Sequence, residues 1–215
     1  MKNYSTVLFD LDGTLFDSGE GVKNSVVYAL DKFGIKVEDR DALGCFIGPP
    51  LTVSFKTFYG FDEENADRGV AFYREYYKEK GIFEGYVYDG IEECLKRLKD
   101  SGKKIVVATS KPEVFAKKIL RLFDIEKYFD FVGGATLDHT RVEKSAVLSY
   151  ALDSVGADRD SSILVGDRVY DAEGARACGI DSLGVLYGHG SREEILSSGF
   201  TYTAENPREI VEILA

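Results

Sequence analysis

Two aspartates near the start of the chain have the types and spacing to do chemistry together. Asp10 and Asp12 follow a short apolar run, residues 6–9, of the kind that forms a buried β-strand. Because side chains alternate along an extended chain, both carboxylates would point to the same side at the end of that strand, and Gly13 would let the backbone turn at once. An Asp-Gly pair is also a common turn signal. That explanation does not say why two acids should crowd one site, where a cation or a proton must offset their repulsion.

A second pair of acids follows a second apolar run. Asp167 and Asp171 lie four residues apart, after residues 163–166, in a loop that enters a predicted helix. As purely structural residues, Asp167 would belong to a turn and Asp171 would cap the helix. Together the two pairs place four carboxylates at the carboxyl ends of predicted strands, a cluster that is hard to keep ionised without a metal. Oxygen ligands without Cys or His favour Mg²⁺.

Hydroxyl and ammonium groups occur at two other junctions between a strand and a helix. Thr109 and Ser110 end the apolar run 105–108 and precede Pro112, which is favoured in the first turn of a helix. Hydroxyls and free backbone N–H groups at a helix start suit a phosphate, although Ser and Thr are also common helix caps. Lys144 lies near the start of another predicted helix, where a cation opposes the helix dipole; a surface lysine tolerates that position at small cost.

The elements that must position these residues alternate between strands and helices. Beyond residue 90 the pattern predicts strands at 104–108, 129–132, 162–165 and 182–185, helices at 90–99, 112–122, 143–155 and about 171–178, and a helical tail. Repeated β-α units indicate an α/β fold with a doubly wound, Rossmann-like parallel sheet. Such sheets bind ligands at the carboxyl ends of their strands.

A helical block interrupts this pattern directly after the first pair of aspartates. Residues 19–33, 51–59 and 63–80 have helical periodicity and stop at glycines. We therefore expect residues 17–84 to form an inserted α-helical cap, and residues 1–16 and 85–215 to form a Rossmann-like core. Twelve of the 27 Phe and Tyr residues lie between residues 46 and 88. Most should fill the interior of the small cap, while one or two, such as Phe55, Tyr73 or Phe83, could stack on a ring of a substrate.

Composition narrows the classes of partner. A net charge of −10 argues against nucleic acid and against an anionic membrane surface, since both require a basic surface. No apolar run is long enough to span a bilayer, and the first apolar run is too short for a signal peptide. Cys45, Cys94 and Cys178 are odd in number and far apart. Neither a disulfide framework nor a zinc site is indicated, and we expect a cytoplasmic protein.

In this order, the four groups of polar residues resemble the four motifs of the haloacid dehalogenase-like hydrolases, most of which are phosphatases. The matching segments are Asp-x-Asp-Gly-Thr at 10–14, Thr-Ser-Lys-Pro at 109–112, residues 141–145 around Lys144, and Gly-Asp-x-x-x-Asp at 166–171. The resemblance covers essentially the whole chain. Within the family, segments 21–25, 46–51 and 73–77 are similar to bacterial proteins grouped with phosphoglycolate phosphatases, some relatives of which are described as 5′-nucleotidases.

This resemblance implies a Mg²⁺-dependent phosphatase that acts on a small phosphorylated metabolite. Asp10 would be the nucleophile that becomes phosphorylated, and Asp12 would be the general acid and base. The implied ligands are Thr109, Ser110 and Lys144 for the phosphoryl group, and Asp10, Asp12 (through its backbone carbonyl), Asp167 and Asp171 for the metal.

Two other functions are weighed against a phosphatase of the phosphoglycolate phosphatase or 5′-nucleotidase type. A phosphomutase of the β-phosphoglucomutase type needs the same four motifs, but its cap must hold a bisphosphate, and no additional basic cluster in the cap compels this. A non-catalytic binding module would lack the nucleophile or the lysine. Phe55, Arg74 and Lys80 are the cap residues expected to contact the leaving group, although both basic residues are also typical of a solvated surface. The sequence sets neither the substrate nor the oligomeric state.

Overall fold

The computed structural model describes residues 2–138 and 140–215, and it divides into two compact units. The core unit contains the residues up to Phe16 and from Val87 onward, and the helical unit spans Asp17–Tyr86. The chain passes between the units at two short strands, β2 (Phe16–Asp17) and β3 (Tyr86–Val87), which pair with each other.

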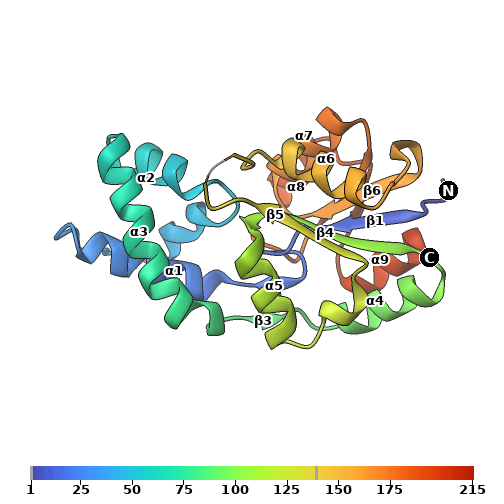
Figure 1. Ribbon diagram of the computed structural model, residues 1–215, viewed down its shortest axis with the longest axis horizontal. Helices are drawn as coiled ribbons and strands as arrows, with labels where there is room; N and C mark the ends of the chain where they lie inside the picture. Colours follow the sequence, from blue (N-terminus) through green and yellow to red (C-terminus); the bar gives the residue numbers. More distant parts are fainter. Residues whose placement is uncertain (1, 139) are drawn as a thin grey trace. The chain divides into compact units, whose positions relative to one another are not determined.

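A parallel sheet forms the centre of the core unit (Figure 1). Within the described residues it has six strands in the order β5-β4-β1-β6-β7-β8, and every neighbouring pair is parallel. The strands are β1 (Thr6–Phe9), β4 (Lys104–Pro112), β5 (Phe131–Ala135), β6 (Ser162–Gly166), β7 (Asp181–Val185) and β8 (Tyr202–Ala204). The chain moves outward from β1 to β4 and β5, and then returns to the other side of β1. Open α/β sheets bind ligands beside such a reversal, at the carboxyl ends of the strands.

Helices cover both faces of this sheet, which is why its central strands are almost continuously apolar. The helices are α4 (Ile91–Asp100), α5 (Glu113–Leu122), α6 (Lys144–Ser154), α7 (Val169–Cys178), α8 (Arg192–Ser197) and α9 (Pro207–Leu214). Figure 1 shows α6 and α7 on one face and α4, α5 and α9 on the other. Leu8, Val106 and Leu164 of the three central strands are wholly buried against α6 and α7. The predicted α/β class and doubly wound parallel sheet are confirmed.

Two elements of the core differ from the expectation. The tail, expected to be helical, also contains β8, an edge strand that pairs with β7. Three residues are too few to show an alternating pattern among polar neighbours. Strand β4 runs to Pro112 rather than ending at residue 108, because it continues beside β5 through an irregularity between Thr109 and Pro112.

The helical unit is built from α1 (Gly19–Asp31), α2 (Leu51–Tyr59) and α3 (Glu63–Glu79), with short 3₁₀ turns at Asp41–Phe46 and Gly81–Phe83. Helix α3 packs against both α1 and α2. The interior of the helical unit is aromatic. The ring of Phe55 stacks on that of Phe61, with 5.6 Å between centroids, and meets the ring of Phe46 edge-on at 5.1 Å. Large aromatic side chains of this kind bury much apolar area per residue, which suits the core of a small unit.

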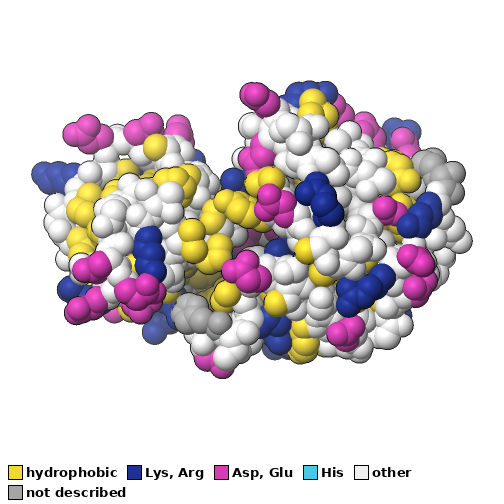
Figure 2. Space-filling view, turned by 90° about the horizontal axis from the view of Figure 1, so that it is seen from above, with side chains coloured by type: hydrophobic (Ala, Val, Ile, Leu, Met, Phe, Trp, Pro, Cys, Tyr) yellow, Lys and Arg dark blue, Asp and Glu magenta, His cyan; other side chains and the backbone are white. Residues whose placement is uncertain are grey.

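The surface carries charges of both signs. Figure 2 shows acidic and basic side chains interspersed over the face in view. Among the described helices, none combines the length and apolar character needed to cross a membrane.

Candidate active site

The turn after β1 presents the first two aspartates at the point where the strand order reverses. The N–H of Asp10 donates to the carbonyl of Val165 on β6 (2.9 Å), which fixes the start of the turn against the neighbouring strand. Gly13 adopts φ +77° and its N–H donates to the carbonyl of Phe16 (2.9 Å). A Cβ at Gly13 would collide with the carboxylate of Asp167, so the turn needs glycine both for its backbone angle and for this close approach.

Lys144 connects two of the predicted acids. It is the first residue of α6, and its Nζ lies 2.9 Å from Oδ1 of Asp10 and 2.7 Å from Oδ1 of Asp171. Only 6% of its side chain is exposed. Burial disfavours the ammonium ion, but the two carboxylates outweigh that effect and raise the pKa of Lys144. The lysine is therefore a permanent buried cation rather than the surface residue that the sequence also allowed.

The loop between β6 and α7 holds the second pair of acids. Oδ2 of Asp171 accepts the backbone N–H groups of Asp167 (3.1 Å) and Arg168 (3.0 Å), so Asp171 caps the helix and binds the lysine at once. Asp167 is fully buried and accepts the hydroxyl of Thr14 (3.3 Å) and the N–H of His189 (2.8 Å). The sequence reasoning missed both donors, which come from the first motif and from a glycine-rich loop after β7.

Three of these acids form a group suited to a metal ion. Asp10, Asp167 and Asp171 each offer a carboxylate oxygen, and the three oxygens lie within 4.8 Å of one another. Burial raises the pKa of Asp10 to about 6 despite the opposing charge of Lys144, and Asp171 adds to the rise. Burial and the charges of Asp171 and Asp10 also raise the pKa of Asp167. One ammonium does not balance three carboxylates, so a hard divalent cation such as Mg²⁺ fits this all-oxygen donor set.

The carboxylate of Asp12 lies outside this group. Its Oδ2 is 2.9 Å from Nζ of Lys111, and the two side chains are only 15% and 6% exposed. Its buried Oδ1 has no hydrogen-bond partner among the described residues. Sequence reasoning did not single out Lys111, although the residue stands inside the Thr-Ser-Lys-Pro segment.

A bulge in β4 carries Lys111 and the two hydroxyl residues. Thr109 is aligned with Gly134 of β5, and Pro112 with Ala135, so two residues of β4 have no counterpart. These are Ser110 and Lys111. Thr109 itself is buried, and its Oγ1 accepts the N–H of Lys111 (3.2 Å). The bulge follows the part of β4 that pairs with β1, the strand that leads into Asp10.

The three cap residues predicted to contact the leaving group differ in their burial and contacts. Phe55 has no exposed surface and packs in the aromatic interior, so the structure does not support contact between this ring and a substrate. Lys80 is exposed at the end of α3 and lies over the ring of Tyr76, 5.6 Å from its centroid. Arg74 is half-buried, its burial lowers its pKa, and its guanidinium has no ion pair or hydrogen bond within residues 2–138 and 140–215.

Comparison with known proteins identifies the family of this chain. A family model described as haloacid dehalogenase-like hydrolase matches residues 7–185, a span that includes all four motifs. The chain belongs to this family.

The names of several similar proteins describe enzymes that act on phosphate groups. A 5′-nucleotidase from Pseudomonas aeruginosa is 44% identical over 192 residues, which cover 89% of this chain and 87% of the relative. The crystal structure of a predicted phosphatase from Clostridium acetobutylicum is 48% identical, with a TM-score of 0.96 over 99% of this chain and 98% of that one. Tyrosine-protein kinase PtkA from Mycobacterium tuberculosis is 38% identical over 88% of this chain, which spans 64% of that longer protein. The chain is an enzyme of the family's phosphatase type, a hydrolase of phosphoric monoesters.

Proposed function

We propose that this protein is a Mg²⁺-dependent phosphatase that hydrolyses a small phosphomonoester through a phosphorylated Asp10. The observation that carries the proposal is the buried ammonium of Lys144, held 2.9 Å from Asp10 and 2.7 Å from Asp171. A cation fixed beside a buried carboxylate can receive the charge of a phosphoryl group that the carboxylate attacks.

In the first step, a carboxylate oxygen of Asp10 forms a bond to phosphorus while the bond from phosphorus to the leaving oxygen breaks. Asp12 gives its proton to the leaving oxygen as general acid. In the second step, Asp12 takes a proton from a water molecule that attacks the same phosphorus. The bond to Asp10 then breaks, which releases inorganic phosphate and restores the carboxylate of Asp10 and the protonated Asp12.

The surrounding residues stabilise the charge on the transferring group. Lys144, the hydroxyl of Thr109 and the backbone of Ser110 would contact its equatorial oxygens, where transition-state charge gathers. Asp10, Asp167, Asp171 and the backbone carbonyl of Asp12 would hold Mg²⁺, which offsets the repulsion between the nucleophile and the anionic substrate when bound.

We assign the choice of leaving group to the cap, residues 17–84. All four motifs lie in the core unit, so the cap is free to vary with the substrate. Within it, the half-buried guanidinium of Arg74, which makes no ion pair or hydrogen bond in the part of the chain that the structure describes, is suited to an anionic or carbonyl group of a substrate. The three cysteines are free, in keeping with the cytoplasmic location that we also propose.

The test is a screen of phosphorylated metabolites for phosphate release in the presence of Mg²⁺. Nucleoside 5′-monophosphates come first, because a relative at 44% identity is named 5′-nucleotidase. 2-Phosphoglycolate and sugar phosphates follow. We expect at least one class to release stoichiometric phosphate. Transfer of the phosphoryl group to a second hydroxyl, without release, would instead assign a phosphomutase. A folded, Mg²⁺-loaded protein that releases no phosphate from any class would overturn the proposal.

A further inference from the structure

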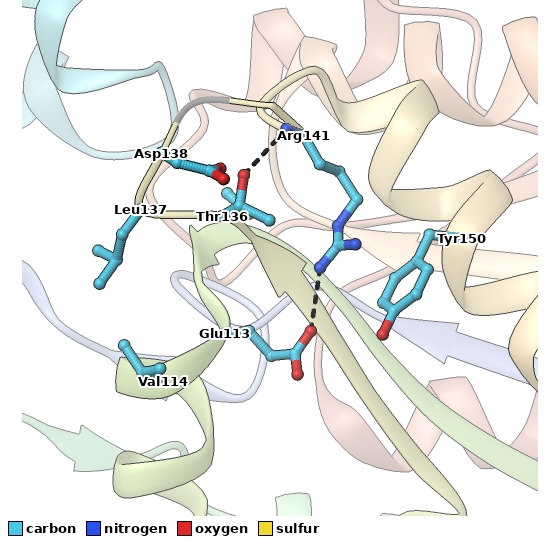
Figure 3. A pocket seen from close by; sticks show the side chains of 8 residues that line it. Glu113, Val114, Thr136, Leu137, Asp138, Arg141 and Tyr150 are labelled. Atoms are coloured by element: carbon cyan, nitrogen blue, oxygen red, sulfur yellow. Dashed lines mark hydrogen bonds and ion pairs between the residues drawn. The ribbon is translucent and has the colours of Figure 1, made fainter.

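Arg141 stands three residues before Lys144, and its guanidinium lies between Glu113 and Tyr150 (Figure 3). Its Nε donates to the carbonyl of Gly134 (2.9 Å), and its Nη2 donates to Oε2 of Glu113 (3.1 Å). The guanidinium also lies over the ring of Tyr150, with its central carbon 3.6 Å from the ring centroid. A planar guanidinium can make all three contacts at once, which a lysine ammonium cannot.

The main chain of Arg141 is fixed as well. Its N–H donates to Oγ1 of Thr136 (3.0 Å), and its carbonyl accepts the N–H of Thr136 (2.9 Å). This reciprocal pair closes the turn that leaves β5. The guanidinium and the backbone of Arg141 are therefore both held in place by hydrogen bonds, three residues before α6 begins at Lys144.

One partner of Arg141, Glu113, belongs to the segment that follows the bulge in β4, and a second, Gly134, lies beside that segment. Glu113 is the first residue of α5 and follows the bulge that carries Ser110 and Lys111. Gly134 touches the same segment, since a Cβ placed there would lie 2.7 Å from the carbonyl oxygen of Lys111 and 2.7 Å from Cα of Glu113. The guanidinium thus joins the segment before Lys144 to the segment after the bulge, and it does so with a charge-assisted hydrogen bond.

We propose that Arg141 is a positioning residue that holds Lys144 and the bulge of β4 in one fixed arrangement. The inference rests on the proposed function, because it concerns the alignment of the groups that stabilise the transferring phosphoryl group. Displacement of such groups by about 1 Å lowers turnover by up to about 100-fold. The free enzyme already buries Lys144 against Asp10, so losing Arg141 should reduce kcat more than it raises KM.

A cavity gives this inference a specific test. Arg141, Glu113 and Tyr150 line a cavity of about 400 Å³ that is open to solvent (Figure 3). In Arg141→Ala the lost guanidinium would leave a gap that opens into this cavity. Guanidinium ion from solution can then enter and bind between Glu113 and the ring of Tyr150.

The experiment compares Arg141→Ala, Arg141→Lys and wild type on a generic phosphomonoester. The matched control is Arg159→Ala, because Arg159 also donates to a backbone carbonyl (Cys178, 2.9 Å) and pairs with a carboxylate, but lies at the amino end of β6. We expect kcat to fall about 10- to 100-fold in Arg141→Ala with KM changed less than about 3-fold. Arg141→Lys should recover only a small part, and Arg159→Ala should match wild type.

Guanidinium at millimolar concentration should raise the kcat of Arg141→Ala several-fold, whereas methylammonium or NaCl at equal ionic strength should not. Should Arg141→Ala fail to fold, Glu113→Gln decides, with an expected loss of kcat and an unchanged melting temperature. If wild type is active, a kcat within about 2-fold of wild type in folded Arg141→Ala or Glu113→Gln would overturn the positioning role and leave the proposed function intact. Failure of guanidinium to rescue Arg141→Ala would do the same. A wild-type protein that releases no phosphate would overturn the proposed function, and this inference with it.

Discussion

In the metal-free protein, replacing Asp10 by Asn should change the free energy of unfolding in a pH-dependent way. Asp10 is 8% exposed, and burial raises its pKa from 3.8 to about 6. The difference, 6 − 3.8, is about 2 pKa units. At roughly 1.4 kcal/mol per unit, it corresponds to about 3 kcal/mol of stability that the protonated carboxyl supplies and the ionised carboxylate does not.

The sign follows from where the proton is bound. Between pH 4 and 6 the folded protein keeps the proton of Asp10 while the unfolded chain releases it. The contribution of Asp10 to stability is therefore full below about pH 4 and is lost as the pH rises through about 6. Asn does not titrate. Relative to wild type, Asp10→Asn should become more stable by about 3 kcal/mol between pH 4 and pH 7.

Urea unfolding in EDTA at several pH values measures this difference. The pH-independent effect of an amide beside Lys144 cancels when the change with pH is taken. The charge of Asp10 also helps to raise the pKa of Asp167, and its loss adds to the difference in the same direction. Asp138→Asn is the control: Asp138 is exposed and its hydroxyl partners, led by Thr136 and Thr140, lower its pKa to about 2, so its difference from wild type should stay flat above pH 4. A flat difference for Asp10→Asn, or one of the opposite sign, would refute the burial argument.

Three further outcomes are expected. EDTA should abolish phosphatase activity, Mg²⁺ should restore it and Ca²⁺ should inhibit it, because Ca²⁺ prefers a higher and looser coordination; full activity in a chelated sample would contradict the metal site. Gly174→Ala should lower kcat about 10-fold, because the new Cβ would lie 2.7 Å from Cγ and 3.0 Å from Cβ of Lys144 and would displace that side chain, while the helix propensity of alanine offsets only part of the cost of overpacking; an unchanged kcat in the folded variant would show that Lys144 can shift without loss. Arg74→Ala should raise KM for the best substrate and leave a generic phosphomonoester almost unaffected; an equal loss of kcat/KM on both would remove Arg74 from substrate selection.

The sequence predicts those parts of the structure that depend on local pattern. Apolar runs locate the central strands because both sheet faces are covered, and parallel strands bring their carboxyl ends to one edge. That is enough to gather Asp10, Asp167 and Asp171, although the last two are separated from the first by more than 150 residues.

Contacts that depend on exact register and packing are not visible in the sequence. The pairing of Lys111 with Asp12 requires the bulge in β4, and nothing in residues 109–112 indicates that two residues are left unmatched. The burial of Phe55 depends on how α2 and α3 pack, since a Phe in an amphipathic helix reads the same whether it faces the interior or a substrate. A three-residue strand such as β8 forms because it can pair with the edge of an existing sheet, and its own sequence carries too little pattern to predict it.

The most direct test of the central claim is phosphate release by wild type and by folded Asp10→Asn, both loaded with Mg²⁺, on the best substrate of the screen. An amide has nearly the shape of a carboxylate but cannot attack phosphorus, so the account predicts turnover by wild type and none above background by the variant. Turnover by Asp10→Asn at a rate near that of wild type would contradict it.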